Sequence, residues 1–396
     1  MKKNIVFVIP SLSAGGAEKS LVNLLNTIDF DRYNVDLILF KQGGIFQSMV
    51  PKEVTILNLG TNYSIFAKRL LSSSFHFLFS LKFLLFWNRI IFSFKNIEKN
   101  NISVTEQKSW KNFRTSLPDF NKKYDAAIGF LEKSSIYCVI DKIQAKNKLG
   151  WIHTNYSSSG MDINFDRYYF NKLNAIITVS PECKNNLCDN FPEYHSKIKI
   201  IYNVVSESII KKLSSQTIVN NSLIFNNSLL TIARFSTEKG CDLAIEAAKI
   251  LHENAIDFKW IFIGDGTMKD FILNKIDDYN LEQNVFLIGL KQNPYPYIKE
   301  CTIYVQPSRY EGKSMAVEEA KILGKPVIVT NFDSAKDQIE SFKTGIIAEM
   351  NPKSIADEIT KLLQNKDLQN QISTNLSKNS YGTESEINKL YDLINE

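Results

Sequence analysis

Residues 308–328, SRYEGKSMAVEEAKILGKPVI, follow a short apolar run at 303–305 and decide what kind of fold the chain has. The apolar run is typical of a buried strand, and Pro307 ends it. From Ser314 the sequence is rich in helix-forming residues, and Gly324 ends that helix. A strand, a short loop and a helix in this order predict one unit of a parallel sheet with helices packed on it.

Two carboxylates stand eight residues apart in this stretch, Glu311 in the predicted loop and Glu319 inside the predicted helix. They allow three functions: an acid/base pair, metal ligands, or groups that bind a ligand's hydroxyls. In the last case Gly312 and Ser314 lie where backbone N–H groups at a helix N-terminus bind an anion. Paired carboxylates of a hydrolase normally lie on separate elements that flank a bond. The spacing alone also fits two solvated glutamates, so it leaves the question open.

Apolar runs alternate with helical stretches along most of the chain, which predicts parallel sheets with helices on both faces. The expected strands are 4–9, 34–40, 54–57, 125–130, 148–152, 175–180 and 197–203, then 228–235, 259–264, 285–289, 302–306 and 325–330. The clearest helices between them are 17–28, 241–253 and 314–323. The chain therefore belongs to the α/β class.

The length of 396 residues suggests two domains, because single hydrophobic cores stop growing at roughly 250 to 300 residues. The alternation pauses in a polar stretch at 204–222 and then restarts. We expect an N-terminal domain at 1–205, a C-terminal domain at 206–380 and a closing C-terminal helix at 381–396. Both domains are predicted to be doubly wound, Rossmann-like parallel sheets that face each other across a ligand cleft.

The cysteines and the N-terminus bear on the compartment. The five cysteines, at 138, 183, 188, 241 and 301, form no CxxC pair, which favours a reducing compartment and argues against a structural zinc site. The apolar run at 5–9 is too short for a signal peptide and is better interpreted as a first strand. We expect a cytoplasmic protein.

Three loops after predicted strands carry groups that suit phosphate. Gly15 and Gly16 open the first helix, although the loop is neither a GxGxxG fingerprint nor a P-loop. Arg234 and Lys239 stand five residues apart at a helix start, where two cations suit a diphosphate. The third loop is the one between 307 and 314, and Gly264 adds a weaker signal. A plain glycine turn and solvated cations are the alternative interpretation.

His153 differs from the other three histidines because it follows a predicted strand and precedes small polar residues in WIHTNYSSSG. We interpret it as a ligand contact, with a satisfied packing histidine as the alternative. His76, His195 and His252 lie in the aromatic segment, a polar loop and a helix end, and carry no such signal.

Taken together, SAGGAEKSLVNLL, WIHTN, IIYNVV, IARFSTEKGCDLAIEA, FIGDG, VFLIGL and the stretch 308–328 resemble the retaining glycosyltransferases of family 4, which have the GT-B fold. The resemblance covers roughly residues 4–60 and 124–395. The E-x7-E motif of that family corresponds to Glu311 and Glu319, and its RxxxxK pair to Arg234 and Lys239. One departure is Lys313, where many members carry Phe or Pro.

The resemblance implies a role for each matching residue. Arg234 and Lys239 would bind the diphosphate of a nucleotide-sugar donor, Glu311 its sugar hydroxyls and Glu319 its ribose. His153 would contact the donor sugar near the reacting carbon. The implied donor-binding residues are Gly15, Gly16, Arg234, Lys239, Gly264, Ile288, Glu311, Gly312, Ser314, Met315 and Glu319, and the implied catalytic residues are His153, Arg234, Lys239 and Glu311. No metal and no cofactor are implied.

The implied reaction is transfer of a hexosyl or N-acetylhexosaminyl group from a nucleotide sugar, for which we expect a UDP-sugar, to a carbohydrate acceptor. The acceptor would be a saccharide or lipid-linked saccharide in bacterial surface polysaccharide assembly. Two alternatives remain: a GT-B enzyme that epimerises or hydrolyses the nucleotide sugar, and a non-catalytic, membrane-associated partner subunit. A NAD-dependent oxidoreductase is disfavoured because the chain lacks GxGxxG.

Segment 65–100 is basic and aromatic, and we call it the basic aromatic segment. Its charged residues are Lys68, Arg69, Lys82, Arg89, Lys95 and Lys99 against Glu98, which accounts for the whole net charge of +5. We expect this segment, through Lys68, Arg69, Lys82, Trp87, Arg89 and Lys95, to bind the plane of an anionic membrane surface. Packing on the first domain's sheet is the alternative, and a membrane span is disfavoured because a lysine would lie inside it.

This binding would place the protein peripherally on the inner face of the cell membrane. Charges outside the basic aromatic segment cancel, so we expect no nucleic-acid partner.

Overall fold

The computed structural model describes residues 1–13, 15–96, 101–217 and 226–396 and divides the chain into two compact units. Unit 1 comprises Met1–Val204 and Glu384–Glu396, and unit 2 comprises Val205–Thr383. Glu98 and Lys99 of the basic aromatic segment lie outside the described residues, as does part of the predicted polar linker.

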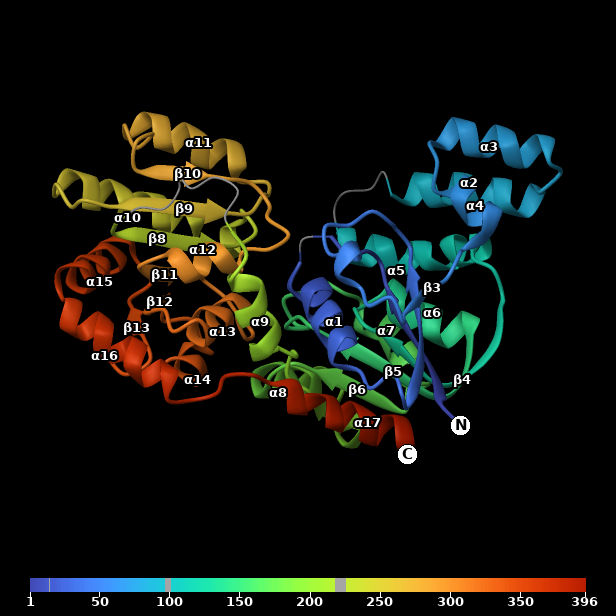
Figure 1. Cartoon of the computed structure of the whole chain (residues 1–396). Coiled ribbons are helices and arrows are strands. Elements are labelled where there is room, and N and C mark those ends of the chain that lie inside the picture. The colour runs from blue at the N-terminus through green and yellow to red at the C-terminus, as the bar shows by residue number, and fades with distance from the viewer. Residues whose placement is uncertain (14, 97–100, 218–225) are drawn as a thin grey trace. The chain divides into compact units, whose positions relative to one another are not determined.

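Unit 1 contains a seven-stranded sheet in the order β3-β2-β1-β4-β5-β6-β7, and all its paired strands are parallel (Figure 1). The strands are β1 Lys3–Ile9, β2 Tyr33–Leu39, β3 Thr55–Ile56, β4 Phe120–Gly129, β5 Ile143–Ile152, β6 Ala175–Thr178 and β7 Ile198–Ile200. The helices are α1 Gly16–Thr27, α2 Gly60–Phe66, α3 Leu70–Phe79, α4 Phe83–Lys95, α5 Ile102–Phe113, α6 Ser134–Lys142, α7 Ile163–Phe170, α8 Pro181–Asn190 and α17 Ile387–Asn395. Short 3-10 helices lie at Gln47–Met49, Arg114–Ser116, Pro192–Lys197 and Glu384–Glu386.

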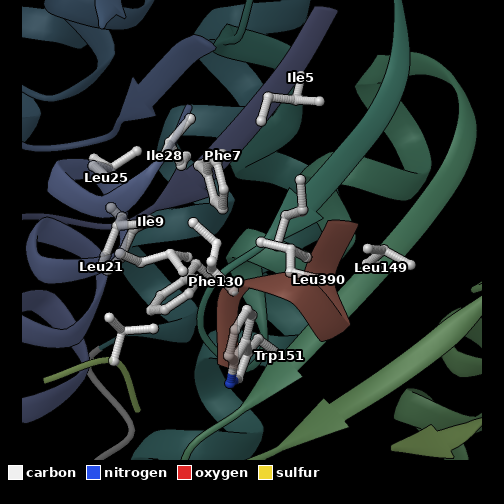
Figure 2. Close-up of a cluster of buried hydrophobic side chains, with 14 of the residues drawn as sticks. Ile5, Phe7, Ile9, Leu21, Leu25, Ile28, Phe130, Leu149, Trp151 and Leu390 are labelled. Carbon is white, nitrogen blue, oxygen red and sulfur yellow. The ribbon is translucent and has the colours of Figure 1, made fainter. Parts of the chain in front are cut away.

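Both faces of the unit 1 sheet are buried, which explains why its strands are apolar without alternation. One hydrophobic cluster joins the sheet to α1 and α17 and includes Phe7, Phe130, Trp151 and Leu390 (Figure 2). A second cluster covers the other face with residues of α6 and α7. The core thus holds the carboxyl ends of β1, β4 and β5 rigidly.

The C-terminal helix α17 is part of unit 1 although the chain reaches it only after all of unit 2. Tyr391 stacks on Tyr33 with ring centroids 4.8 Å apart, and its hydroxyl accepts the Asp29 N–H at 2.9 Å. Leu390 is fully buried among the side chains of the first cluster. The last helix therefore completes the first core.

The basic aromatic segment contains the end of α2 and all of α3 and α4, and these helices carry a small cluster of their own formed by Ile65, Phe66, Phe77 and Leu85. In the part of the chain that the structure describes, no helix is both long enough and apolar enough to cross a membrane. Arg89 is buried, so the prediction that it lies on a membrane-facing surface is wrong. The reason is that Arg89 follows Leu85 by one helical turn and shares its inward face.

Unit 2 contains a six-stranded parallel sheet in the order β10-β9-β8-β11-β12-β13. Its strands are β8 Ser228–Ile232, β9 Lys259–Ile263, β10 Val285–Leu287, β11 Ile303–Gln306, β12 Val327–Thr330 and β13 Ile346–Ala348. Its helices are α9 Glu207–Ser214, α10 Cys241–Glu253, α11 Lys269–Asp278, α12 Tyr295–Glu300, α13 Met315–Ile322, α14 Ala335–Gln338, α15 Pro352–Gln364 and α16 Lys366–Ser377, with a 3-10 helix at Thr237–Lys239.

The structure confirms the predicted α/β class and two parallel sheets, and it differs in details. Strand β13 was not predicted because its apolar run contains only two large apolar residues, Ile346 and Ile347. Strand β8 ends at Ile232, so Arg234 lies in the following loop and not on the strand.

Replacing Leu390 with Ala tests whether α17 is integral to the first core. Leu390 is 0% exposed, so the cavity should lower the free energy of unfolding by about 2–5 kcal/mol. Urea unfolding followed by circular dichroism measures the loss. The exposed Asp392 on the same helix gives a matched control, and Asp392→Ala should change stability by less than about 0.5 kcal/mol. Equal effects of the two variants would contradict the packing described here.

Candidate functional site

The loops after β8 and β11 meet at one edge of the unit 2 sheet, because these two strands are adjacent and parallel. In such sheets the loops at the carboxyl ends of the strands are where ligands bind. The first loop carries Arg234 and Lys239, and the second carries Glu311. The predicted cations and the first carboxylate of E-x7-E are therefore neighbours at the same edge.

An ion pair joins the two loops. The Lys239 ammonium lies 2.8 Å from Glu311 Oε2, and both side chains are largely buried, at 24% and 9% exposure. The other oxygen of Glu311 accepts the Ser308 hydroxyl at 2.9 Å and the Gln306 side-chain amide at 3.2 Å. Glu311 is thus an oriented acceptor that already has three donors.

Arg309 fastens the loop of Lys239 to the loop of Glu311. Its guanidinium makes a two-pronged contact with Asp242, at 2.7 and 2.6 Å, and also donates to the Thr237 carbonyl at 2.8 Å. The Arg309 backbone N–H donates to the Glu238 carbonyl at 2.8 Å. Burial alone would raise the pKa of Asp242, but Arg309 outweighs burial and the pKa is lowered. We call this contact the Arg309–Asp242 clamp.

Gly240 allows the same two loops to approach closely. Its φ is +63°, and a Cβ there would lie 1.9 Å from the Pro307 carbonyl oxygen. Any other residue would therefore be strained and would also push the loops apart.

Arg234, by contrast, is a surface side chain with 66% exposure, and one of its terminal nitrogens lies 3.0 Å from Glu238 Oε1. A pair this exposed is weak and easily exchanged. Arg234 can therefore leave Glu238 for a stronger anion at little cost.

Glu319 lies inside α13 and Ser314 directly before it, as predicted, and both already have hydrogen-bond partners in the protein. Glu319 is 0% exposed, and the Tyr295 hydroxyl donates to its Oε1 at 3.3 Å. The Ser314 N–H donates to Gln338 Oε1 at 2.9 Å, and Gln338 donates back to the Ser314 carbonyl at 3.0 Å. The Ser314 amide therefore already has an acceptor, and its predicted contact with phosphate would require Gln338 to be displaced. Met315 begins α13 directly after it.

The remaining predicted site residues of unit 2 are Gly264, Ile288 and Gly312, and their local surroundings are as follows. A Cβ on Gly264 would lie 1.9 Å from the Ala233 carbonyl, and the Gly264 N–H donates to the Gly289 carbonyl at 3.2 Å. The Ile288 N–H donates to the Phe262 carbonyl at 3.0 Å. Gly312 is half-buried in the loop after Glu311. Gly264 is thus required by backbone packing inside unit 2.

In unit 1, Gly15 precedes α1 and Gly16 begins it. A Cβ on Gly16 would meet nothing within 4 Å, so the space beside it is open, whereas one on Gly15 would meet the Glu18 carboxylate. The Gly15 N–H is taken up by the Ser13 carbonyl at 3.1 Å. Of the two, Gly16 is the position that a ligand can approach.

His153 lies directly after β5, with its ring 4.9 Å from that of Phe130 and stacked 5.9 Å from that of Trp151. Burial lowers the pKa of His153 to about 3, so the imidazole is neutral at physiological pH. Its Nε2 is buried and has no hydrogen-bond partner among the described residues. Such a nitrogen is costly to leave unpaired and is a candidate ligand contact.

Glu132 fixes the backbone that carries this histidine. Its Oε1 accepts the N–H groups of His153 and Thr154, at 2.5 and 2.9 Å, and burial raises the pKa of the Glu132 carboxyl. Glu132, Asp242, Arg309 and Gln338 were all missed from the sequence. Arg309 stands in the stretch 308–328 and Asp242 follows the RxxxxK pair, so proximity to motifs was the only available signal.

Among the residues that the structure places, no group of three or more His, Cys, Asp or Glu side chains could hold a metal ion.

Residues 219–379 match the model of the family described as glycosyl transferases group 1. One relative is the poly(ribitol-phosphate) alpha-N-acetylglucosaminyltransferase of Staphylococcus aureus (strain COL), 29% identical over 252 residues, which are 61% of this chain and 49% of that protein. Another, from Campylobacter jejuni, is named N-acetylgalactosamine-N,N'-diacetylbacillosaminyl-diphospho-undecaprenol 4-alpha-N-acetylgalactosaminyltransferase. It is 29% identical over 196 residues, 48% of this chain and 52% of that enzyme.

Two solved structures are similar over essentially the whole chain. A single-residue mutant of S. aureus TarM, in complex with Fondaparinux, alpha-GlcNAc-glycerol and UDP, has a TM-score of 0.67 at 18% identity and 100% coverage of both chains. Anabaena Alr3699/HepE in complex with UDP and glucose has a TM-score of 0.68 at 16% identity and 99% coverage of both.

The structural likeness confirms the GT-B type of fold. The matches confirm the resemblance to glycosyltransferases that the motifs predicted. The chain spans about half the length of the curated relatives it matches.

Replacing Asp242 with Asn tests the clamp. The substitution removes the negative charge that Arg309 contacts. This should weaken the hold on the Lys239 loop by about 1 kcal/mol and make the Lys239 amine about five-fold more available. The acylation rate of Lys239, followed by mass spectrometry, measures this. The exposed Asp257 of the same unit provides the control Asp257→Asn. Unchanged labelling in Asp242→Asn would refute a role of the clamp in holding Lys239.

The pKa of His153 predicts a pH effect on stability. Because the folded pKa is about 3 and the unfolded value about 6.5, the unfolded chain binds more protons between these values, and stability falls as the pH drops through this window. Glu132 acts in the opposite direction, since its folded pKa is raised. His153→Gln should therefore lose about 2 kcal/mol less than wild type between pH 7 and pH 5 in urea unfolding. Parallel losses in the two proteins would show that His153 is not buried as a neutral group.

Proposed function

We propose that the protein is a retaining glycosyltransferase that moves a sugar from a nucleotide-sugar donor to a carbohydrate acceptor on a lipid carrier, in the assembly of a surface polysaccharide. The observation that carries the proposal is the Lys239–Glu311 pair at the loop edge of a glycosyl transferases group 1 domain. It combines a cation for phosphate and an oriented carboxylate for hydroxyls.

Lys239 and Arg234 are the proposed diphosphate ligands. The Lys239 ammonium has three protons, and the side chain keeps 24% of its surface exposed beside Glu311. It can therefore bridge Glu311 and a phosphate oxygen without giving up the ion pair. The exposed Arg234 can turn from Glu238 to the same diphosphate as a two-pronged donor. Both charges would stabilise the nucleoside diphosphate as it leaves.

Glu311 is the proposed acceptor for hydroxyls of the donor sugar. Ser308, Gln306 and Lys239 hold its carboxylate in one orientation, which favours recognition of a fixed hydroxyl pattern over proton transfer. His153 is the proposed sugar contact that the resemblance implies, since its neutral Nε2 is buried without a partner in the described chain.

Glu319 is proposed to bind the ribose, as the motif implies. Its carboxylate is fully buried beneath Tyr295, so this contact requires the Tyr295 side chain or a neighbour to move. The proposal therefore includes a local opening around α12 when the nucleotide binds.

The lipid carrier is proposed from the names of relatives. The Campylobacter protein is named for a diphospho-undecaprenol acceptor, and an Escherichia coli protein is named UDP-Gal:alpha-D-GlcNAc-diphosphoundecaprenol alpha-1,3-galactosyltransferase. The latter is 30% identical over 34% of its length. We propose a similar acceptor here, with a UDP-sugar as donor, no metal requirement, and a place of action at the inner face of an anionic membrane.

A thermal-shift and turnover screen of UDP-, GDP- and dTDP-sugars in the presence of EDTA tests the proposal. We expect one donor to stabilise the protein and to be consumed only when an acceptor is present. Consumption without any acceptor would favour the epimerase or hydrolase alternative. No stabilisation by any donor would refute the transferase.

Lys239→Ala should lower turnover of that donor by about 10²–10³, because a charge that acts on the leaving diphosphate is lost. Lys249, which lies on the neighbouring helix α10 at 38% exposure, gives the control Lys249→Ala with unchanged turnover. A comparable rate in both variants would remove Lys239 from the mechanism.

A further inference from the structure

Helices α3 and α4 and the turn at 80–82 between them form a hairpin with an unusually apolar surface; we call residues 70–95 the α3–α4 hairpin (Figure 1). Of the eighteen exposed large apolar residues in the described chain, ten lie in these 26 residues, so this surface is concentrated and not scattered. They are Leu71, Phe75, Leu78, Phe79, Leu81, Phe83, Leu84, Trp87, Ile91 and Phe94.

Their spacing places them on one outer face of each helix. In α4, Leu84, Trp87, Ile91 and Phe94 recur every three or four residues, which is one side of an α-helix. The opposite side is already used, because Leu85 and Arg89 are its buried residues. In α3, Phe75 and Phe79 stack with ring centroids 6.4 Å apart on the exposed side. A helix of a water-exposed protein normally places polar residues there.

The basic residues divide into two groups. Arg89 faces inward, where it donates to the Lys68 carbonyl at 2.9 Å and lies over the ring of Phe66, 5.4 Å from its centroid. Lys95 donates to Asn112 Oδ1 at 2.9 Å. These two hold α4 against the rest of unit 1.

Lys68 and Arg69 before α3, and Lys82 in the turn, are exposed. The sequence has no acidic residue between Glu53 and Glu98. The outer surface of the hairpin is therefore largely apolar, and its charged side chains are all basic.

Only one kind of partner fits both properties. A second copy of the chain, meeting this face symmetrically, would bring Lys68, Arg69 and Lys82 against themselves. An anionic lipid surface accepts apolar side chains below its headgroups, a tryptophan at their level and cations above them. The helices have 10 and 13 residues, so at about 1.5 Å per residue neither spans a hydrocarbon layer of about 30 Å.

We propose that the α3–α4 hairpin is a docking surface for anionic lipid. It lies with its outer face in the interface and with Phe79, Leu81, Phe83 and Leu84 at its tip entering the acyl boundary. The buried Arg89 and the half-buried Lys95 support the hairpin from its inner side. The inference deepens the proposed function by naming the part of the chain that meets the membrane, and it rests on no residue of the donor site.

The experiment uses the full chain and vesicles of phosphatidylcholine with or without about 30% phosphatidylglycerol. Trp87 is a built-in probe, since it is 59% exposed whereas Trp110, Trp151 and Trp260 are buried. Its emission should shift to shorter wavelength with anionic vesicles and be quenched by brominated acyl chains. Trp87→Phe supplies the blank. Raising the salt from about 0.1 M to about 1 M should release the protein partially, because the apolar contacts are not screened.

Two sets of variants with matched controls separate the contributions. Phe79→Ser with Leu84→Ser should reduce vesicle binding at least ten-fold, whereas Phe271→Ser with Leu273→Ser, at exposed apolar residues of α11, should not change it. Lys68→Gln, Arg69→Gln and Lys82→Gln should each weaken binding about five-fold. Lys211→Gln, Lys343→Gln and Lys353→Gln, at positions 59%, 59% and 80% exposed, change the net charge equally and should leave binding intact.

Equal binding to neutral and anionic vesicles, or an unshifted Trp87 emission, would overturn the proposal. So would a dimer that disappears in Phe79→Ser with Leu84→Ser while no vesicle binding is seen, since a second copy would then cover the face. Donor binding is read separately with nucleotide sugars in the absence of vesicles. A protein that binds vesicles and no donor would refute the transferase alone, and the reverse result would refute the hairpin alone.

Discussion

The contact on which the candidate site of unit 2 depends is the ion pair between Lys239 and Glu311. A pair removed from water in this way contributes little net stability, because desolvation offsets the attraction. Its contribution is to fix the positions of the two side chains. Neighbouring contacts fix the same two loops, because Arg309 donates two hydrogen bonds to Asp242 and Gly240 lies close to the Pro307 carbonyl. An incoming phosphate would then meet an ammonium that is already oriented. Folding has already ordered the ammonium, so no reorganisation is needed when a charge arrives. Water, by contrast, has to reorient around each new charge.

The α3–α4 hairpin of unit 1 is also preformed by internal contacts, but here the cation is buried and the apolar side chains are exposed. Its cationic support, Arg89, is buried among aromatic rings, and its large apolar side chains face outward. The inner cluster of Ile65, Phe66, Phe77 and Leu85 gives the hairpin a core of its own. A hairpin that is folded before it meets a surface does not have to order its backbone on contact, and binding strength then follows exposed apolar area and charge.

The alternation of strands and helices could be predicted from the sequence, whereas the side-chain contacts between different elements could not. The buried strands, and the strand, loop and helix of 303–322, follow from apolar runs and the Gly and Pro residues that end them, whereas β13 has only two large apolar residues, Ile346 and Ile347. Arg89 was assigned to the surface from composition, although its place one turn after Leu85 would have put it inside. The bond from Gln338 to Ser314 joins residues 24 apart, and no spacing rule reveals it. The close approach of Gly264 to the backbone of Ala233 is likewise a contact between distant residues that the sequence does not reveal.

The two glutamates of the stretch 308–328 are distinguished by what surrounds them. Although they are only eight residues apart, Glu311 lies at the sheet edge beside Lys239, whereas Glu319 lies in the middle of α13 beside Tyr295. A pair that shares one proton needs its carboxylates in contact, whereas these two have separate hydrogen-bond partners. Glu311 accepts hydrogen bonds from a cation, a hydroxyl and an amide, and these donors fix the orientation of its carboxylate. Glu311 is thus an oriented acceptor beside a cation, whereas Glu319 is a buried acceptor beside a tyrosine hydroxyl.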